Sequence, residues 1–258
     1  MKSTNFLLPA LGLCILINAC QKDQSTSSEM TPLSVRMTDA PGNFEEVNVD
    51  IKEVQVNSHK SGWITLTTKA GIYNLLTLAN GLDTLLGSAV VPSGKIEEIR
   101  LILGTNNTVK VNGVVYPLAT PSAQQSGLKI KIDDEDLAGS AGHIILFDFD
   151  AGKSIHLTGN GTYMLKPVLR HIHKNQIVTG IKGSVIPPQS HPNILAILGS
   201  DTISTYTNND GDFFIKGLVA GSYTLVLLPN GLYKDTTFKN VIVTTGSVTK
   251  MGSITLHL

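Results

Sequence analysis

Residues 207–225, "TNNDGDFFIKGLVAGSYTL", decide the fold of the C-terminal part of the chain. The segment 209–211 predicts a tight turn, because its Asp can accept a bond from its own backbone and its Gly tolerates a positive φ. Phe213 and Ile215 follow two positions apart, so both side chains point to one face of a strand. The stretch therefore predicts a strand that leaves a turn and packs apolar side chains into a core.

The rest of this stretch predicts the return of the chain. Gly217 and Gly221 bracket a tight loop, and Tyr223 and Leu225 start the next strand. The pattern resembles the carboxypeptidase regulatory-like, or prealbumin-like, family of β-sandwiches. We assign residues 178–258 to such a domain, which holds about seven strands. The resemblance implies an accessory module, since no zinc-peptidase or G-x-S-x-G motif accompanies it.

The N-terminal part alternates in the same way. "LSVRMTD" (33–39) and "VNVDIKEVQVN" (47–57) place apolar residues at every second position, with a phase change at Lys52-Glu53 that predicts a bulge. One run, 73–89, instead favours short helical turns that end at Asn80-Gly81. Further strands are expected at "WITLTT" (63–68), "KIEEIRLIL" (95–103), "TVKVNGVVYPL" (108–118), "LKIKI" (128–132), "HIILFDFD" (143–150) and "YMLKPVLRHIH" (163–173). Within 108–118, "VNGV" (111–114) predicts an Asn-Gly hairpin turn.

Short strands with frequent turns predict an antiparallel sandwich. The opening motif, with "WITL", "YNLLTLANG", "VPSGKIEEIRLIL" and "YMLKPVLR", resembles domain of unknown function 4382. That resemblance implies a secreted all-β domain and supplies no activity to carry over. We therefore expect an all-β chain of two antiparallel sandwiches in tandem, 32–174 and 178–258, the first with a short helical insertion.

The N-terminus has the parts of a secretory signal. Lys2 is followed by an apolar run from Phe6 to Ile17, about a dozen residues and too short to span a membrane. The run ends at Ala19-Cys20, which resembles a bacterial lipobox. We predict a cleaved signal at 1–19, lipid on Cys20, a flexible tether over 20–31 and a surface-exposed outer-membrane protein. The alternative is an ordinary signal peptide.

The amino-acid composition argues against several classes of function. The chain has 20 basic and 20 acidic residues, so it offers no basic surface typical of nucleic-acid binding. Its two cysteines lie in the signal segment and at the lipidation point, which excludes a disulfide framework and a cysteine-ligated zinc site. No cofactor is expected. The partners expected are a membrane through Cys20, and a glycan or a cell-envelope protein.

Three aspartates are candidate chemical groups. Asp39 precedes an Ala-Pro-Gly turn and Glu45-Glu46, which suggests oxygen ligands for a cation; the interpretation we favour is that Asp39 caps its loop while both glutamates are solvated. Asp148 and Asp150 share one strand face, as paired carboxylates do in glycosidases. Acids at a strand end are more often exposed to solvent, so we expect no catalytic residue.

Two further polar groups have competing interpretations. The run Asp133–Asp136 predicts a solvated turn, with metal binding as the alternative. His171 and His173 share a strand face and could ligate a metal, but two histidines without a third ligand are a weak signal. Polar packing between the domains is the expected role of these histidines.

Aromatic residues bear on sugar binding, because flat rings stack on sugar faces. Trp63 is the only indole, and we expect it in or beside the core rather than at an exposed loop edge. Tyr206 and Tyr233 lie near turns of the second domain and are better candidates for a surface platform. The sequence thus favours a lipid-anchored accessory protein, with glycan binding ahead of contact with a protein partner and of a hydrolase using Asp148 and Asp150.

Overall fold

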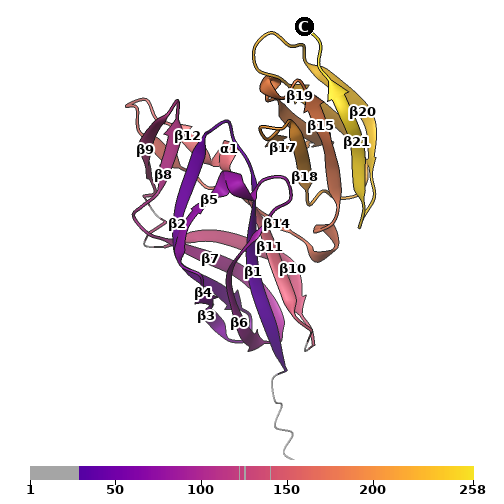
Figure 1. The fold of residues 1–258 in the computed structure, drawn as a ribbon. Coiled ribbons are helices and arrows are strands. Elements are labelled where there is room, and N and C mark those ends of the chain that lie inside the picture. Colours follow the sequence, from indigo (N-terminus) through magenta and orange to yellow (C-terminus); the bar gives the residue numbers. More distant parts are fainter. Residues whose placement is uncertain (1–28, 122, 125, 140) are drawn as a thin grey trace, which may run out of the picture.

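The structure, a computed structural model, describes residues 29–121, 123–124, 126–139 and 141–258. They form two β-sandwiches joined by a short connection, and the C-terminal sandwich lies beside one end of the first (Figure 1). Each sandwich has its own hydrophobic core. The predicted all-β tandem architecture is confirmed, while the signal, Cys20 and nearly all of the tether lie outside the described residues.

The first sandwich packs a five-stranded sheet against a nine-stranded one. The smaller sheet has the order β14-β11-β1-β6-β4 and consists of β1 (Met30–Ala40), β4 (Thr67–Thr68), β6 (Thr84–Pro92), β11 (His143–Asp150) and β14 (Leu169–Ile172). The larger sheet runs β10-β7-β2-β8-β9-β13-β12, with β3 and β5 paired to β2. Its strands are β2 (Glu46–Ser58), β3 (Gly62–Thr65), β5 (Gly71–Asn74), β7 (Gly94–Leu103), β8 (Thr108–Val111), β9 (Val114–Ala119), β10 (Leu128–Leu137), β12 (Ile155–Leu157) and β13 (Tyr163–Leu165).

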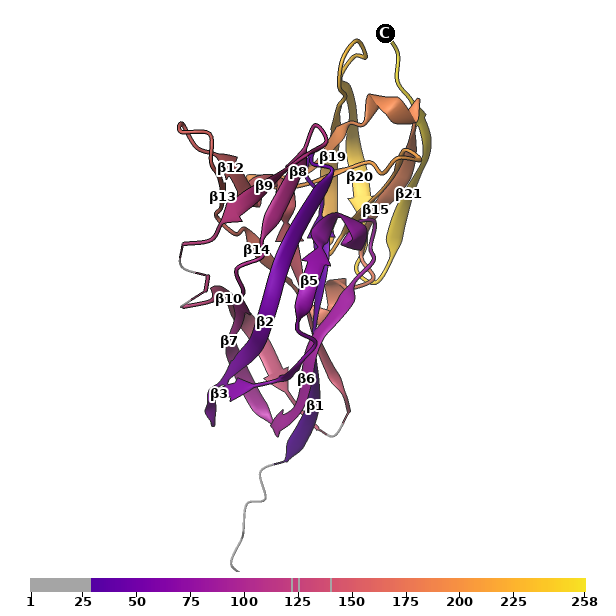
Figure 2. The same ribbon diagram turned by 60° about the vertical axis from the view of Figure 1, so that its left-hand side comes forward.

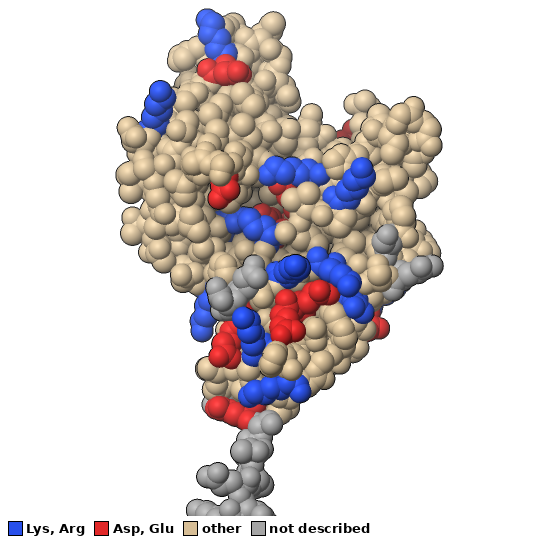
Figure 3. Space-filling model, turned by 180° about the vertical axis from the view of Figure 1, so that it is seen from behind, with Lys and Arg blue, Asp and Glu red and all other residues tan. Residues whose placement is uncertain are grey.

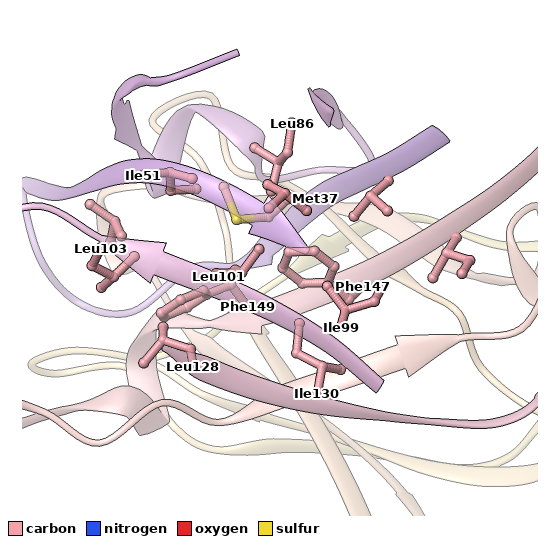
Figure 4. Packing of buried hydrophobic residues seen from close by; sticks show 14 of the residues in the cluster. Met37, Ile51, Leu86, Ile99, Leu101, Leu103, Leu128, Ile130, Phe147 and Phe149 are labelled. Carbon is pink, nitrogen blue, oxygen red and sulfur yellow. The ribbon is translucent and has the colours of Figure 1, made fainter. Parts of the chain in front are cut away.

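Alternating side chains of both sheets fill the first core. Phe147 and Phe149 are fully buried, as the alternation in β11 predicts, and they pack with Met37, Ile99 and Leu101 between the sheets (Figure 4). Burial of such side chains contributes roughly 1.5–3 kcal/mol each. The core therefore fixes which residues of β11 face outward.

Several local predictions for this sandwich are confirmed. β2 has a register shift between Ile51 and Glu53, where the phase change predicted a bulge. Asn112-Gly113, both with positive φ, form the turn of the β8–β9 hairpin. The expected helical turns are the 3-10 helix η1 (Leu75–Leu78), and Asn80-Gly81 follow it with positive φ.

Two local predictions are wrong. The run 163–173 is not one strand: it divides at Pro167 into β13 in the larger sheet and β14 in the smaller sheet. The run Asp133–Asp136 is not a turn but part of β10, which has a register irregularity there. Pro167 lacks the N–H that a continuous ladder requires, which accounts for the first difference.

The second sandwich has the seven strands expected. A three-stranded sheet, β18-β15-β21, faces a four-stranded sheet, β17-β16-β19-β20. The elements are β15 (Gly180–Ile186), β16 (Asn193–Leu198), β17 (Asp201–Tyr206), β18 (Asp212–Lys216), β19 (Gly221–Leu228), β20 (Thr236–Val243) and β21 (Val248–Thr255), with the 3-10 helices η2 (Lys174–Gln176) before β15 and η3 (Pro188–Ser190) after it. Phe213, Ile215, Tyr223 and Leu225 are buried, as predicted.

The turn before β18 forms with a different side chain from the one expected. Asn208 Oδ1 accepts bonds from the backbone N–H groups of Asp210 and Asp212, and Gly211 has a positive φ. Asn208 therefore performs the role that the sequence interpretation gave to Asp210.

Polar contacts hold the two sandwiches together. Arg170 of β14 donates to the carbonyls of Lys216 and Gly217 at 2.9 and 2.6 Å. Lys216 Nζ in turn contacts the Gly81 carbonyl at 3.2 Å and Asp83 Oδ2 at 3.3 Å. The segment after η1 thus contacts β18 of the second sandwich. These contacts fix how the loops of the two sandwiches lie relative to each other.

No helix among the described residues is long and apolar enough to cross a membrane.

Candidate binding cleft between the two sandwiches

A cleft with a volume of about 1000 Å³ lies between the two sandwiches. We call it the inter-sandwich cleft. The first sandwich contributes residues 41–45, Leu76, Ala79 and the hairpin residues 111–112, and the second contributes 188–189, His191 and 206–209. The space-filling view shows the molecule notched between its two lobes (Figure 3). Ligand sites in proteins commonly have volumes of about 300–1,000 Å³.

Two stacked rings lie in the wall that the second sandwich contributes. His191 and Tyr206 have ring centroids 5.6 Å apart and an interplanar angle of 29°. His191 ends η3 with φ 35°, a conformation that costs energy for a residue other than glycine, and Thr207 Oγ1 lies 3.4 Å from its Nδ1. The local backbone thus holds the imidazole against the phenol ring.

Burial sets the charge of this ring pair. Desolvation lowers the pKa of His191 below its ordinary value. Desolvation, and then the Asp150 carboxylate, raise the pKa of Tyr206. Both rings are therefore uncharged at neutral pH, and the pair offers an aromatic face with polar ring edges.

Four side-chain amides line the same cleft as the rings. Within the described part of the chain, no hydrogen bond is formed by the side-chain amides of Asn43, Asn112, Gln189 or Asn209, all of which line the cleft. Each amide offers two donor hydrogens and an acceptor oxygen. The cleft therefore presents polar but uncharged hydrogen-bonding groups.

Charge at the cleft is limited to its rim. Glu45 is the only acidic or basic side chain, apart from His191, among the lining residues, and Lys110 lies 3.7 Å from it. Glu45 is exposed, as the sequence interpretation expects, and it also accepts the Gly113 N–H at 2.8 Å. Elsewhere, on the face shown in Figure 3, acidic and basic side chains alternate over the first sandwich. This cleft is suited to a neutral ligand.

The three candidate aspartates lie outside the cleft, in the junction between the sandwiches. Asp39, Asp148 and Asp150 are all buried, so the solvent exposure expected of Asp148 and Asp150 is wrong. The physical reason is that the second sandwich covers the face of β11 that points away from the first core. Within the described residues, no three-ligand metal set includes any of these aspartates.

Each of these carboxylates has a structural partner. Asp148 pairs with Arg170 at 2.9 Å, and Asp150 caps the short helix α1 (Ala151–Ser154) through the Lys153 N–H. Asp39 Oδ1 accepts the Ala151 N–H at 3.2 Å, so it caps α1 rather than its own loop. The adjoining cavity measures about 10 Å³, which is too small for a sugar substrate.

The three aromatic candidates lie in different surroundings. Tyr206 lines the cleft, whereas Trp63 lies on β3 with the Arg100 guanidinium 3.9 Å from its ring centroid. Trp63 is 40% exposed, so the expectation of a position in or beside the core is wrong. Tyr233 packs against the core of the second sandwich.

Sequence reasoning missed most of the cleft. Gln189 and His191 follow the Pro187-Pro188 pair. Asn112 belongs to a hairpin turn that the sequence predicts without indicating that it lines a cleft. Turn residues of this kind signal a loop but not what the loop faces. The cleft exists only because two domains bring their loops together.

The architecture and the cleft define an all-β protein of two sandwiches with a polar site between them. The chain belongs to the family described as Domain of unknown function (DUF4382), whose sequence profile matches residues 30–167. That match covers the first sandwich up to β13 and confirms the resemblance seen in the sequence. No curated protein matches the chain significantly.

Solved structures with some similarity are bacterial β proteins. A type II cohesin–X–dockerin complex from Acetivibrio cellulolyticus has 21% identity over 30% of this chain and 56% of that one, with a TM-score of 0.25. The Bacillus anthracis TIE protein has 13% identity, coverage of 89% and 34%, and a TM-score of 0.24. The shaft pilin SpaA from Lactobacillus rhamnosus GG has 9% identity, coverage of 88% and 96%, and a TM-score of 0.22.

The chain thus spans about half of the cohesin-complex chain and about a third of the TIE protein. Such scores define neither partners nor activity.

Proposed function

We propose that this protein is a non-catalytic, lipid-anchored accessory protein of the cell envelope that binds a neutral glycan in the inter-sandwich cleft. The observation that carries the proposal is the stacked His191–Tyr206 pair in a cleft that is also lined by amide side chains. Sugars present both apolar faces and hydroxyl groups, and these need a flat ring together with donors and acceptors at its edge.

Membrane attachment is a sequence-based part of the proposal. Cys20, at the end of the signal segment, would carry the lipid, and residues 20–31 would connect it to β1. β1 has 11 residues, which span about 35 Å at ~3.3 Å per residue. The loop 41–45 at its far end lines the cleft, so the cleft would open away from an outer-membrane surface (Figure 1).

The second sandwich supports an accessory role. We assign it to the carboxypeptidase regulatory-like family, on its seven strands and on the Asn-Asp-Gly turn that precedes Phe213. The assignment supplies no catalytic residue, and the buried aspartates of the junction have no space for a substrate.

A glycan array tests the ligand class. The chain from Gln21 onward keeps every described residue and should bind a subset of neutral glycans. Tyr206→Ala should weaken that binding at least tenfold, because stacking on a sugar face is lost. Trp63→Ala is the matched control: its ring is exposed on the first sandwich and outside the cleft, so binding should not change. Binding that survives Tyr206→Ala and is lost in Trp63→Ala would show that the cleft is not the glycan-binding site.

Palmitate labelling tests the anchor separately. The wild-type protein should incorporate labelled palmitate in cells, and Cys20→Ala should not. If Cys20→Ala still incorporates the label, Cys20 is not the lipidated residue. That result would leave the proposal of glycan binding in the cleft unchanged.

Contact with a protein partner is the second candidate. The strands β8, β9, β12 and β13 form an arm of the first sandwich (Figures 1 and 2). This arm exposes Val114, Val115 and Leu157. Apolar side chains grouped at a surface favour protein contacts. A silent glycan array would favour this function over glycan binding.

A further inference from the structure

Three histidines and one glutamate gather at an open side of the first sandwich, away from the cleft. Glu135 comes from β10, an edge strand of the larger sheet, while His143 and His171 come from β11 and β14 of the smaller sheet, and His173 follows β14 directly. β10 and β14 are in contact, and both views place them side by side (Figures 1 and 2). The group therefore bridges the two sheets.

An irregularity in β10 turns Glu135 inward. Lys131 is opposite Glu98 of β7, but Glu135 is already opposite Ile96, so β10 uses four residues where β7 uses two. Bulges of this kind re-aim side chains, often beside functional sites. Ile96 is fully buried, and the Glu135 side chain is only 8% exposed. A carboxylate in such a position requires partners, because burying an isolated charge is costly.

The distances within the group fall into two kinds. His143 Nε2 lies 2.7 Å from Glu135 Oε2, which is a hydrogen bond. His171 Nε2 and His173 Nδ1 lie 3.4 and 3.9 Å from Glu135 Oε1, beyond the usual hydrogen-bond range. The three ligand atoms of Glu135, His171 and His173 all lie within 4.8 Å of one another.

The longer distances match the spacing of ligands around a metal ion. Zinc bonds of ~2.0–2.1 Å at tetrahedral angles place neighbouring ligand atoms about 3.3 Å apart. The His171–Glu135 distance already matches this spacing, and His173 Nδ1 lies roughly half an ångström farther from Glu135 Oε1 than this spacing. The His173 side chain is 38% exposed and marks the side from which an ion and a fourth ligand would enter.

We propose that Glu135, His171 and His173 bind a divalent transition-metal ion, with zinc as the ion of choice. Two imidazoles and one carboxylate favour zinc or iron over calcium and magnesium, which prefer all-oxygen sites. His143 is a positioning residue: it holds the second oxygen of the Glu135 carboxylate, as outer partners of metal ligands do. The fourth position is left for water.

The ion would act as a clamp. It would join β10 and β14, which belong to different sheets of the described chain, at the point where the chain leaves for the second sandwich. An ion that binds only the folded chain raises its stability with concentration. Under this proposal His171 and His173 act within the first sandwich, whereas the sequence suggests polar packing between the domains for them.

Zinc titration of the chelator-treated chain from Gln21 onward tests the proposal. Calorimetry should give one zinc per chain, and the unfolding midpoint Tm should rise with zinc concentration but not with calcium. Absence of zinc binding, or an equal response to calcium, would overturn the site.

Variants identify the ligands. His173→Ala should lower zinc affinity at least a hundredfold without unfolding the chain, because the His173 side chain is 38% exposed. Glu135→Gln should have a similar effect. His143→Gln should lower affinity about tenfold through the carboxylate it positions. His59→Ala is the matched control, since His59 pairs with Glu97 at 2.8 Å on the exposed surface of the same sandwich. Loss of zinc binding in His59→Ala, or its retention in His173→Ala, would contradict the assignment.

Discussion

Arg170 is the residue on which the junction of the sandwiches most depends. Its guanidinium pairs with the buried Asp148 carboxylate and donates to two carbonyls of the second sandwich. A single side chain therefore neutralises a buried charge and orients the neighbouring domain. The planar guanidinium suits this role because it presents several donors in fixed directions.

Arg170→Ala should lower the free energy of unfolding by about 3 kcal/mol, because Asp148 would remain buried without its ion-pair partner. Urea unfolding measures this change. Lys129→Ala serves as the control, since Lys129 is half exposed and lies 3.9 Å from Glu98; it should change stability by less than about 0.5 kcal/mol. Equal effects of the two substitutions would contradict the role of Arg170.

Asp39 should make stability depend on pH. Burial, and then the Asp148 charge, raise the pKa of its carboxyl well above the ordinary value. The folded chain therefore holds this proton more tightly than the unfolded chain, so the contribution is present at low pH and is lost as pH rises through the folded pKa.

Asp39→Asn imitates the protonated acid and keeps an oxygen for the Ala151 N–H. We expect the variant to be more stable than the wild-type protein at pH 8, with the advantage shrinking toward pH 4. Urea unfolding across this range measures the difference. An advantage that is constant with pH, or that grows as pH falls, would show that Asp39 is ionised in the folded chain.

Individual residues were predictable where the decisive contacts are local. Alternation in β11 correctly predicted Phe147 and Phe149 in the core. The same alternation placed Asp148 on the outer face but could not show that another domain covers that face. The partner of His171 and His173 was missed for the same reason, because Glu135 lies on a strand of the opposite sheet.

At the scale of elements, the segment between η1 and β6 packs against the second sandwich. Asn80 Oδ1 accepts the Phe214 N–H at 3.1 Å, and Gly81, with φ +82°, lies against the Phe214 ring. The sequence identified Asn80-Gly81 as the end of helical turns, which is correct. It did not indicate that the turn receives β18, since β18 is far along the chain.

Gly81→Ala should destabilise the junction by roughly 2 kcal/mol more than Gly113→Ala, because an added Cβ would overlap the Phe214 ring. Both glycines have positive φ, and a Cβ at Gly113 would meet nothing within 4 Å. The pair of variants therefore separates the clash from backbone strain of about 1 kcal/mol. Equal losses in thermal unfolding would show that Gly81 does not contact the second sandwich.

The course of β10 was beyond sequence reasoning. Four consecutive acidic residues predict a solvated turn, yet they continue the strand, and the register irregularity brings Glu135 inside. The bulge in β2 was predictable because its apolar positions change phase. β10 offers no apolar residue after Ile132 until Leu137, so its pattern does not reveal the change.

At the scale of the whole molecule, two sandwiches with separate cores combine to form one site. Period-two alternation and regular turns were sufficient to predict the tandem architecture. The cleft required the relative placement of the domains, which depends on contacts of Arg170, Lys216 and the Asn80-Gly81 turn. The first sandwich belongs to a family of unknown function, so the family suggests no activity. The inter-sandwich cleft is therefore the best guide to what the protein does.

An NMR titration of the chain from Gln21 onward shows whether the cleft is the binding site. The probe is the oligosaccharide with the strongest signal on the glycan array. We predict that the amide resonances which shift belong to residues 41–45, 111–112, 188–189, His191 and 206–209, on both sandwiches at once. Shifts confined to the surface around Trp63 or to one sandwich, or no shifts at all, would contradict the account.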